Sequence, residues 1–129
     1  MSVSKKTIRD SVRELIAGVY PHPVHTTQKY SPDESELDFV LVYFTEGEVV
    51  DQGISCYVDA DLEVGIFMQG DASDDQLDQY ESAILGAMSG ASELSQKVIG
   101  MTFRGYTYAD TESENLSALI LKFNLQYNY

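Results

Sequence analysis

Two long segments of the chain alternate apolar and polar residues, and this period of two constrains the fold more than any other feature. In residues 56–68 the apolar positions are Val58, Ala60, Leu62, Val64 and Ile66. In residues 117–129 they are Leu119, Leu121, Phe123, Leu125 and Tyr127. Successive side chains of a β-strand point to opposite faces, so each segment predicts a strand with one buried and one wet face.

Two further segments complete the predicted sheet. Residues 37–45 are apolar on both faces, which is typical of an interior strand and places this strand centrally in the sheet. Residues 101–108 form the fourth strand, and a polar turn over 110–115 joins it to the last one. The glycine-punctuated residues 46–54 predict a long hairpin arm. Its apolar side chains need a partner or a fold-back, and they are Val49, Val50 and Ile54.

Helical periodicity marks two other segments. Residues 4–19 predict an amphipathic helix, with Ser4 or Thr7 as its N-cap. The second helix begins at Ser73, which forms a capping box with Gln76, and ends near Gly90. Residues 20–36 are expected to form an extended connection, and 93–98 a short third helix. The apolar stripe of the first helix is Ile8, Val12, Leu15, Ile16 and Val19, and that of the second is Leu77, Tyr80, Ile84 and Met88.

The order of these elements predicts an α+β fold. We expect a mostly antiparallel four-stranded sheet with two main helices packed on one face. The chain has 129 residues, which fits a single domain over 1–129.

The charge is large and unevenly distributed. Eight Lys and Arg stand against 21 Asp and Glu, so the net charge is −13. Because phosphate contacts need a basic surface, this balance argues against stable nucleic-acid binding. Residues 1–13 nevertheless hold Lys5, Lys6, Arg9 and Arg13 against Asp10 alone. A basic helix on an acidic body favours either complementary packing between copies or a simply solvated helix.

The sequence also bears on the compartment. No run approaches the roughly 18 apolar residues that a membrane helix needs, and the first residues lack the apolar stretch of a secretion signal. The single Cys56 allows no disulfide within the chain, which fits a reducing compartment. We therefore expect an intracellular protein that does not interact with membranes.

Candidate chemistry is sparse. His22 and His25 could hold a metal only with further ligands, and Asp59, Asp61 and Glu63 form either a divalent-cation or catalytic cluster or a solvated strand face. No nucleophile elbow, phosphate-binding glycine loop or Cys–His signature is present. We thus expect no enzyme, no cofactor and no metal site. Four tyrosines on neighbouring predicted strands suit either an interface or ordinary sheet packing: Tyr106, Tyr108, Tyr127 and Tyr129.

Several segments resemble a known family in the same order along the chain. They are residues 33–48, the helix start Asp74-x-x-Leu77-Asp78-x-Tyr80, the strand Gly105-Tyr106-x-Tyr108 and the final alternating strand 121–127. Together with the amphipathic first helix and the long arm, they are similar to the tail terminator proteins of lambda-type phages, the minor tail protein U family. The resemblance spans nearly the whole chain.

The resemblance implies a structural protein of a phage or prophage tail. Such a protein forms a ring of six subunits that caps the tail tube, ends its polymerisation and provides the surface for head joining. Its partners are expected to be further copies of itself, the major tail tube protein and a head–tail joining protein. The protein is expected in the host cytoplasm during assembly and then in the virion tail.

Three groups of residues are candidates for the contacts of such a ring. Arg9 and Arg13 are predicted to approach acidic residues of a neighbouring subunit or of the tube. Val49, Val50 and Ile54 of the arm are predicted to become buried on assembly. Asp59, Asp61 and Glu63 are predicted to line the pore and repel DNA. The alternative function is an acidic DNA mimic that inhibits a nucleic-acid-binding enzyme, and the net charge alone favours it.

Overall fold

The computed structural model describes residues 4–21, 23–26, 39–69, 74–89, 91–110 and 116–128, and the structural statements below concern these residues. Three helices and five strands form in this part of the chain. In chain order they are α1 (Lys5–Ala17), β1 (Val24–His25), β2 (Phe39–Asp51), β3 (Cys56–Gln69), α2 (Asp74–Met88), α3 (Ser92–Ser95), β4 (Gly100–Asp110) and β5 (Leu116–Asn128).

The sheet differs from the predicted one. It has five strands in the order β1-β2-β3-β5-β4, and it is mixed, because β1 pairs with β2 in parallel while the other pairs are antiparallel. The prediction of four mostly antiparallel strands is therefore wrong. The missed strand has only two residues, within the segment predicted to be an extended connection. Such a strand is too short to show periodicity, and its pairing with Val40 and Leu41 fixes it instead.

The central strand is β3, not β2 as predicted. β2 is nevertheless an interior strand, because β1 and β3 flank it at Val40 and Leu41, and it carries apolar residues on both faces. Its first residue, Phe39, is buried on the face opposite to Val40 and stacks on Phe67 of β3, with ring centroids 5.0 Å apart. Phe39 and Phe67 thus form an apolar contact on the outer face of the sheet.

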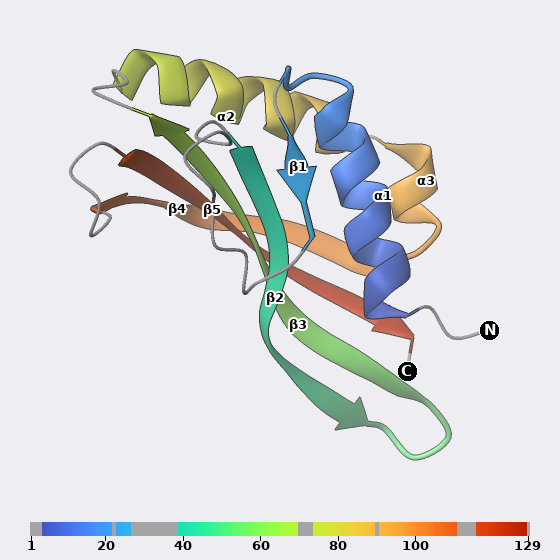
Figure 1. Cartoon of the computed structure of the whole chain (residues 1–129). Helices are drawn as coiled ribbons and strands as arrows, with labels where there is room; N and C mark the ends of the chain where they lie inside the picture. The colour runs from blue at the N-terminus through green and yellow to red at the C-terminus, as the bar shows by residue number, and fades with distance from the viewer. Residues whose placement is uncertain are drawn as a thin grey trace.

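All three helices lie on one face of the sheet (Figure 1). α1 begins after Ser4, whose Oγ accepts a hydrogen bond from the backbone N–H of Thr7 at 3.1 Å, so the predicted N-cap is confirmed. The α1 stripe apart from Val19, the α2 stripe and the alternating residues of β3 and β5 meet in one core, whereas Val19 is 41% exposed. Its fully buried side chains include Ile8, Val12, Ile16, Leu62, Val64, Ile66, Leu77, Ile84, Leu119, Leu121 and Leu125.

Strands β2 and β3 continue past α1 as the predicted hairpin arm, here residues 46–60 (Figure 1). A bulge between Phe44 and Glu46 separates the arm from the rest of β2. The arm closes at Gly53, whose φ of 87° lies in the left-handed region that favours glycine. Its N–H donates to Oδ1 of Asp51 at 2.9 Å. The arm is thus an ordered antiparallel ladder that ends in a tight turn.

Candidate assembly surfaces

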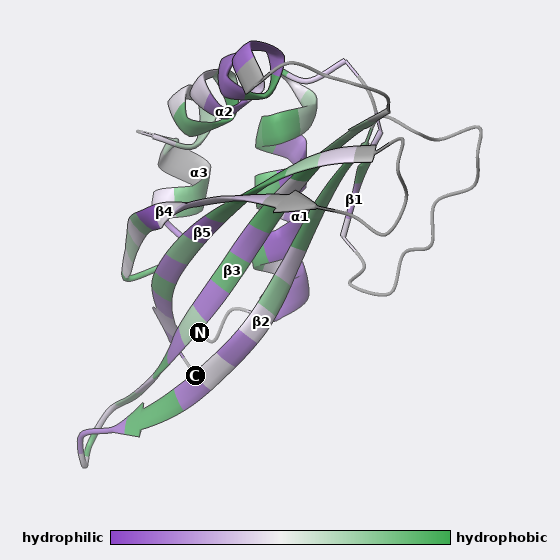
Figure 2. Cartoon of the chain, turned by 90° about the vertical axis from the view of Figure 1, so that its left-hand side faces the viewer, coloured by the Kyte–Doolittle hydropathy of each residue, from purple (hydrophilic) through white to green (hydrophobic). Residues whose placement is uncertain are grey.

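The outer face of the arm and of the adjoining sheet carries five carboxylates, which we call the acidic face: Glu46, Glu48, Asp59, Asp61 and Glu63. The strand register places Glu46 opposite Asp61, and Glu48 opposite Asp59. The colours of Figure 2 show that polar and apolar residues alternate along these strands. The three carboxylates predicted on one strand face, Asp59, Asp61 and Glu63, do share that face, and two from β2 join them.

Amide side chains of β5 donate hydrogen bonds to two carboxylates of this surface. The Nδ2 of Asn124 donates to Oδ1 of Asp59 at 2.6 Å and to Oδ1 of Asp61 at 3.1 Å. Gln126 donates through Nε2 to the Oδ1 of Asn124 at 2.6 Å and to that of Asp59 at 3.4 Å. One cation, Lys122, lies opposite Glu63 in the ladder. The sequence pattern placed these three residues on the outer face, but only the register shows which carboxylate each one meets.

Tyr43 of β2 lies next to the acidic face, opposite Glu63. The hydroxyl of Tyr43 donates to Oε1 of Glu63 at 3.0 Å. Burial, followed by the negative charge of Glu63 and this hydrogen bond, raises the pKa of Tyr43 well above its ordinary value of 10.0. Tyr43 therefore stays a neutral donor at physiological pH.

The metal interpretations gain no support from the described residues. Among them, no group of three or more His, Cys, Asp or Glu side chains has an arrangement that could hold a metal ion. His25 lies in β1 and its ring is 6.3 Å from that of Phe39, whereas His22 lies outside the described residues. The acidic face accepts hydrogen bonds from amide side chains and from Tyr43.

The basic residues of α1 lie on the helix-covered side of the sheet, opposite to the acidic face (Figure 1). Lys6 forms an exposed ion pair with Asp10 at 2.9 Å, and this hydrogen bond lowers the pKa of Asp10. Arg13 is exposed, while Arg9 is half-buried. Within the described residues, the buried Nε of Arg9 has no hydrogen-bond partner. The structure thus keeps the two predicted charge patches apart and does not pair them within one subunit.

The three predicted apolar residues of the arm point in different directions. Val49 lies on the helix side, opposite Val58, and is half exposed. Val50 lies on the outer side, opposite Tyr57, and Ile54 is fully exposed in the turn. They do not form one apolar surface.

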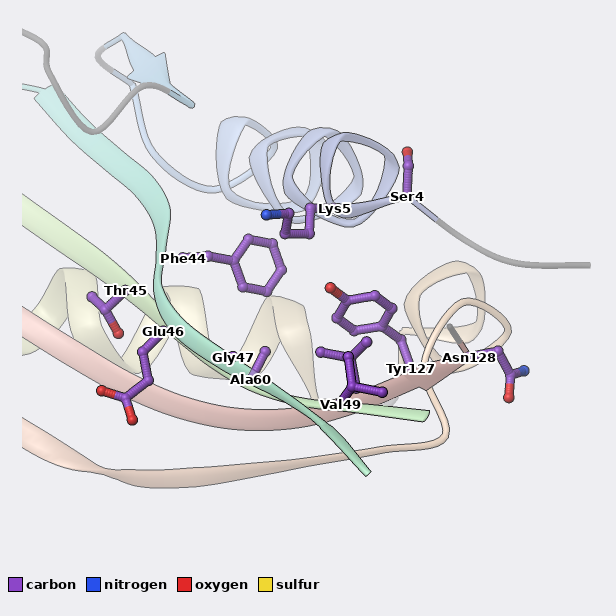
Figure 3. A pocket seen from close by; sticks show the side chains of 11 residues that line it. Ser4, Lys5, Phe44, Thr45, Glu46, Gly47, Val49, Ala60, Tyr127 and Asn128 are labelled. Carbon is purple, nitrogen blue, oxygen red and sulfur yellow. The ribbon is translucent and has the colours of Figure 1, made fainter. Parts of the chain in front are cut away.

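A hollow of about 630 Å³ lies at the base of the arm, on the helix side, and no pattern in the sequence indicates it (Figure 3). Phe44, Val49 and Tyr127 form much of its apolar wall, and Lys5 of α1 lies at its upper side. Gly47 contributes backbone alone. The hollow exists because β2 and β3 extend beyond the end of α1, so the helix covers only part of their apolar face.

The edge strand β4 exposes a row of large apolar side chains: Phe103, Tyr106 and Tyr108, preceded by Ile99. The register places the three aromatic residues opposite Phe123, Leu121 and Leu119, on the helix side. Of the predicted interface tyrosines, Tyr106 and Tyr108 are thus exposed, with Tyr108 bonded to Asp78 of α2, whereas Tyr127 is buried and Tyr129 lies outside the described residues. A second hollow of about 550 Å³ lies between β4 and the helices α2 and α3.

A sheet with helices on one side, a charged opposite face, a projecting arm and exposed aromatic residues along one edge has the surfaces of a protein that assembles with other proteins. Residues 3–127 match the family model "Phage minor tail protein U". The chain belongs to this family, and its role is therefore structural, in the tail of a phage particle.

A solved structure agrees on the fold. A chain in the virion of a native gene transfer agent particle matches with a TM-score of 0.61 and 15% sequence identity, over 92% of this chain and 84% of that chain. A search of curated protein sequences found no match. None of the helices in the described residues is long and apolar enough to cross a membrane.

Proposed function

We propose that this protein is a tail terminator: a single domain whose copies form a ring of six that caps the tail tube, ends its polymerisation and provides the surface to which the head joins. The proposed role is non-catalytic, and its partners are further copies of the chain, the major tail tube protein and a head–tail joining protein. Assembly takes place in the host cytoplasm, and the ring remains in the virion tail.

The family match supports the tail role, and one structural observation supports a ring. The basic residues of α1 and the acidic face lie on opposite sides of the sheet. The basic side of α1 is therefore available for acidic groups other than the acidic face of its own subunit, and a contact between two different surfaces generates a ring when its rotation closes. We propose that Arg9 and Arg13 make such contacts with a neighbouring subunit or with the tube.

The arm and the acidic face receive separate roles in this proposal. Val49, Val50 and Ile54 become buried against the tube protein or the neighbouring subunit, because exposed aliphatic side chains gain free energy when they leave water. Asp59, Asp61 and Glu63 face the pore, where their charge repels DNA phosphates and allows the genome to pass without adhering.

The test is the particle mass of the purified protein across a concentration series, with and without Mg²⁺ and with and without tube protein, together with electron microscopy of large species. A six-membered ring with an open centre, or capping of purified tubes, is the expected result. A chain that stays monomeric or dimeric even with tube protein would contradict the proposal. Binding to a nucleic-acid-processing enzyme in place of the tube would favour the DNA-mimic alternative, for which the net charge of −13 is the only argument.

A second measurement concerns the arm. Hydrogen exchange of residues 46–54 is expected to slow when the monomer enters the ring or binds the tube. Unchanged exchange in the assembled particle would mean that the arm takes no part in assembly.

A further inference from the structure

Within the described residues, the terminal strands of the sheet are β1, which has only two residues, and β4. β4 is the last strand in the order, and β2 pairs with β1 only at Val40 and Leu41, which leaves the outer edge of residues 42–51 unpaired. Unpaired strand edges are templates for another chain. We propose that the β4 edge of one copy pairs with the 42–51 edge of β2 in the next copy. This inference rests on the proposed ring and specifies the contact that builds it.

Strand direction is compatible with this pairing. Each of the pairs β2–β3, β3–β5 and β5–β4 is antiparallel, so β4 runs opposite to β2. A second copy placed beside the first by rotation about an axis along the strands keeps its orientation. Its β4 then meets β2 of the first copy as an antiparallel neighbour, and the sheet continues. Because the two edges differ, the contact is heterologous and can close into a ring.

The ladder also shows which residues lie at the same level on the two edges. Phe103 lies opposite Phe123, Phe123 opposite Leu62, and Leu62 opposite Phe44. If the sheet continues without a shift, Phe103 of one copy reaches the level of Phe44 in the next.

That level coincides with the hollow at the base of the arm. Phe103 is 39% exposed on the helix side of β4, and the hollow opens on the helix side of β2 beside Phe44 and Gly47. Gly47 adds no side chain to this wall, and a Cβ there would lie 3.4 Å from Cβ of Ala60. The aromatic ring on one edge thus fits the apolar space on the other, as expected for two parts of one interface.

The charges at the two edges are complementary on the opposite side of the sheet. Arg104 is the only charged residue in 100–108, while Glu46 and Glu48 lie on the outer face of the arm. Thr102 lies opposite Asn124, Asn124 opposite Asp61, and Asp61 opposite Glu46, so Arg104 comes within two residues of the level of Glu46. Diagonal neighbours at this spacing are within reach of long side chains. Glu46 points away from the hollow (Figure 3), which leaves it available to this arginine.

The experiment exchanges these two charges and, in a separate variant, removes the aromatic ring of Phe103. Arg104→Glu, Glu46→Arg and the double variant are compared by particle mass over a concentration series under the conditions in which the wild type forms rings. Each single reversal is expected to raise the concentration for half-assembly at least tenfold, and the double variant to recover most of it. Phe103→Ala is expected to weaken assembly similarly. Because Glu46→Arg replaces a like-charge pair with Asp61 by an opposite-charge pair, its loss of assembly cannot be attributed to unfolding.

Matched controls change similar residues away from both edges. Glu14→Arg on the exposed side of α1 and Val19→Ala, which is 41% exposed, are expected to assemble as the wild type does. Hydrogen exchange distinguishes backbone pairing from side-chain contact: residues 42–51 and 100–108 are both expected to exchange more slowly in the wild-type ring than in Arg104→Glu.

The outcomes separate the two proposals. The edge pairing is wrong if the wild type forms rings but the single reversals assemble equally well, or if hydrogen exchange slows at neither edge. Either result leaves the proposed ring unaffected. If the wild type forms no ring under any condition, including with tube protein, the proposed function is wrong and the pairing falls with it.

Discussion

Asp61 lies directly opposite Glu46 in the β2–β3 ladder, with both carboxylates on the outer face of the sheet. Like charges in this position are destabilising. The same register places Val49 opposite Val58 and Gly47 opposite Ala60 on the helix side. A shift by one residue would turn these apolar residues to the outer face, so burial fixes the register despite the repulsion. The arm therefore folds with an unfavourable charge arrangement that an interaction outside the subunit can relieve.

Asn124 is expected to be essential for tolerating this arrangement, because its Nδ2 donates to both Asp59 and Asp61. Asn124→Leu should lower the free energy of unfolding by about 1–3 kcal/mol, since two half-buried carboxylates lose a donor. Chemical denaturation measures the change. Adding Asp59→Asn should restore part of the stability. An unchanged midpoint in Asn124→Leu would mean that solvent satisfies these carboxylates equally well.

Glu81 of α2 should make the free energy of unfolding decrease as pH rises. Burial, together with the nearby charge of Asp78, raises the pKa of Glu81 above its ordinary value of 4.5. The folded state then binds more protons than the unfolded state just above pH 4.5, so stability decreases as pH rises through that window and the loss is complete above the folded-state pKa. Glu81→Gln should therefore melt at a higher temperature than the wild type at neutral pH and show no gain at about pH 3. Glu14→Gln on α1 is the control, and an equal gain there would contradict the assignment to Glu81.

Substitution by alanine should lower the stability of the protein at Gly65 and raise it at Gly86. A Cβ at Gly65 would lie 2.7 Å from Cε2 of Phe67 and 3.1 Å from Cδ1 of Ile120, and Phe67 is held by its stacking on Phe39. Gly65→Ala should cost about 1–3 kcal/mol of stability. Gly86 in α2 has nothing within 4 Å of the same position, so Gly86→Ala should gain about 0.5–1 kcal/mol. Thermal denaturation of the two variants in parallel tests the pair, and a loss in both would contradict the assigned geometry of α2.

The basic side of α1 should matter for assembly and not for folding. Arg13 is exposed and Arg9 half-buried, and the described residues offer no acidic partner bonded to either. Arg9→Glu combined with Arg13→Glu should leave the circular dichroism spectrum of the monomer unchanged and weaken assembly by at least tenfold, in a salt-dependent manner. Lys6→Gln, which removes only an exposed ion pair, is the control. Normal assembly of the double variant would exclude α1 from the interface.

The acidic face should affect DNA passage if it lines the pore. Replacing Asp59, Asp61 and Glu63 by Asn, Asn and Gln keeps the side-chain shapes and removes the negative charges. Phage particles that carry this triple variant should form normal tails but release DNA more slowly, which fluorescence of a DNA-binding dye measures over time. Glu14→Gln again serves as the control. Release at the wild-type rate would place these residues away from the DNA path.

Most of the helices and strands could be predicted from local patterns in the sequence. Alternation identified β3 and β5, helical periodicity identified α1 and α2, and the glycines marked the arm, because these signals depend only on neighbours along the chain. The sequence also correctly assigned Asp59, Asp61 and Glu63 to one strand face. The family resemblance, which rested on short segments in a conserved order, was confirmed by the match over residues 3–127.

The way in which these elements combine could not be predicted from local patterns. The parallel strand β1, the central position of β3 and the hollow beside Gly47 arise from contacts between segments far apart in the chain, to which local periodicity is insensitive. The same is true of the separation of Arg9 and Arg13 from the acidic face. A strand pattern states which face of a strand is buried, but the pairing order decides which strands become edges, and in this protein those edges carry Phe103 and Glu46.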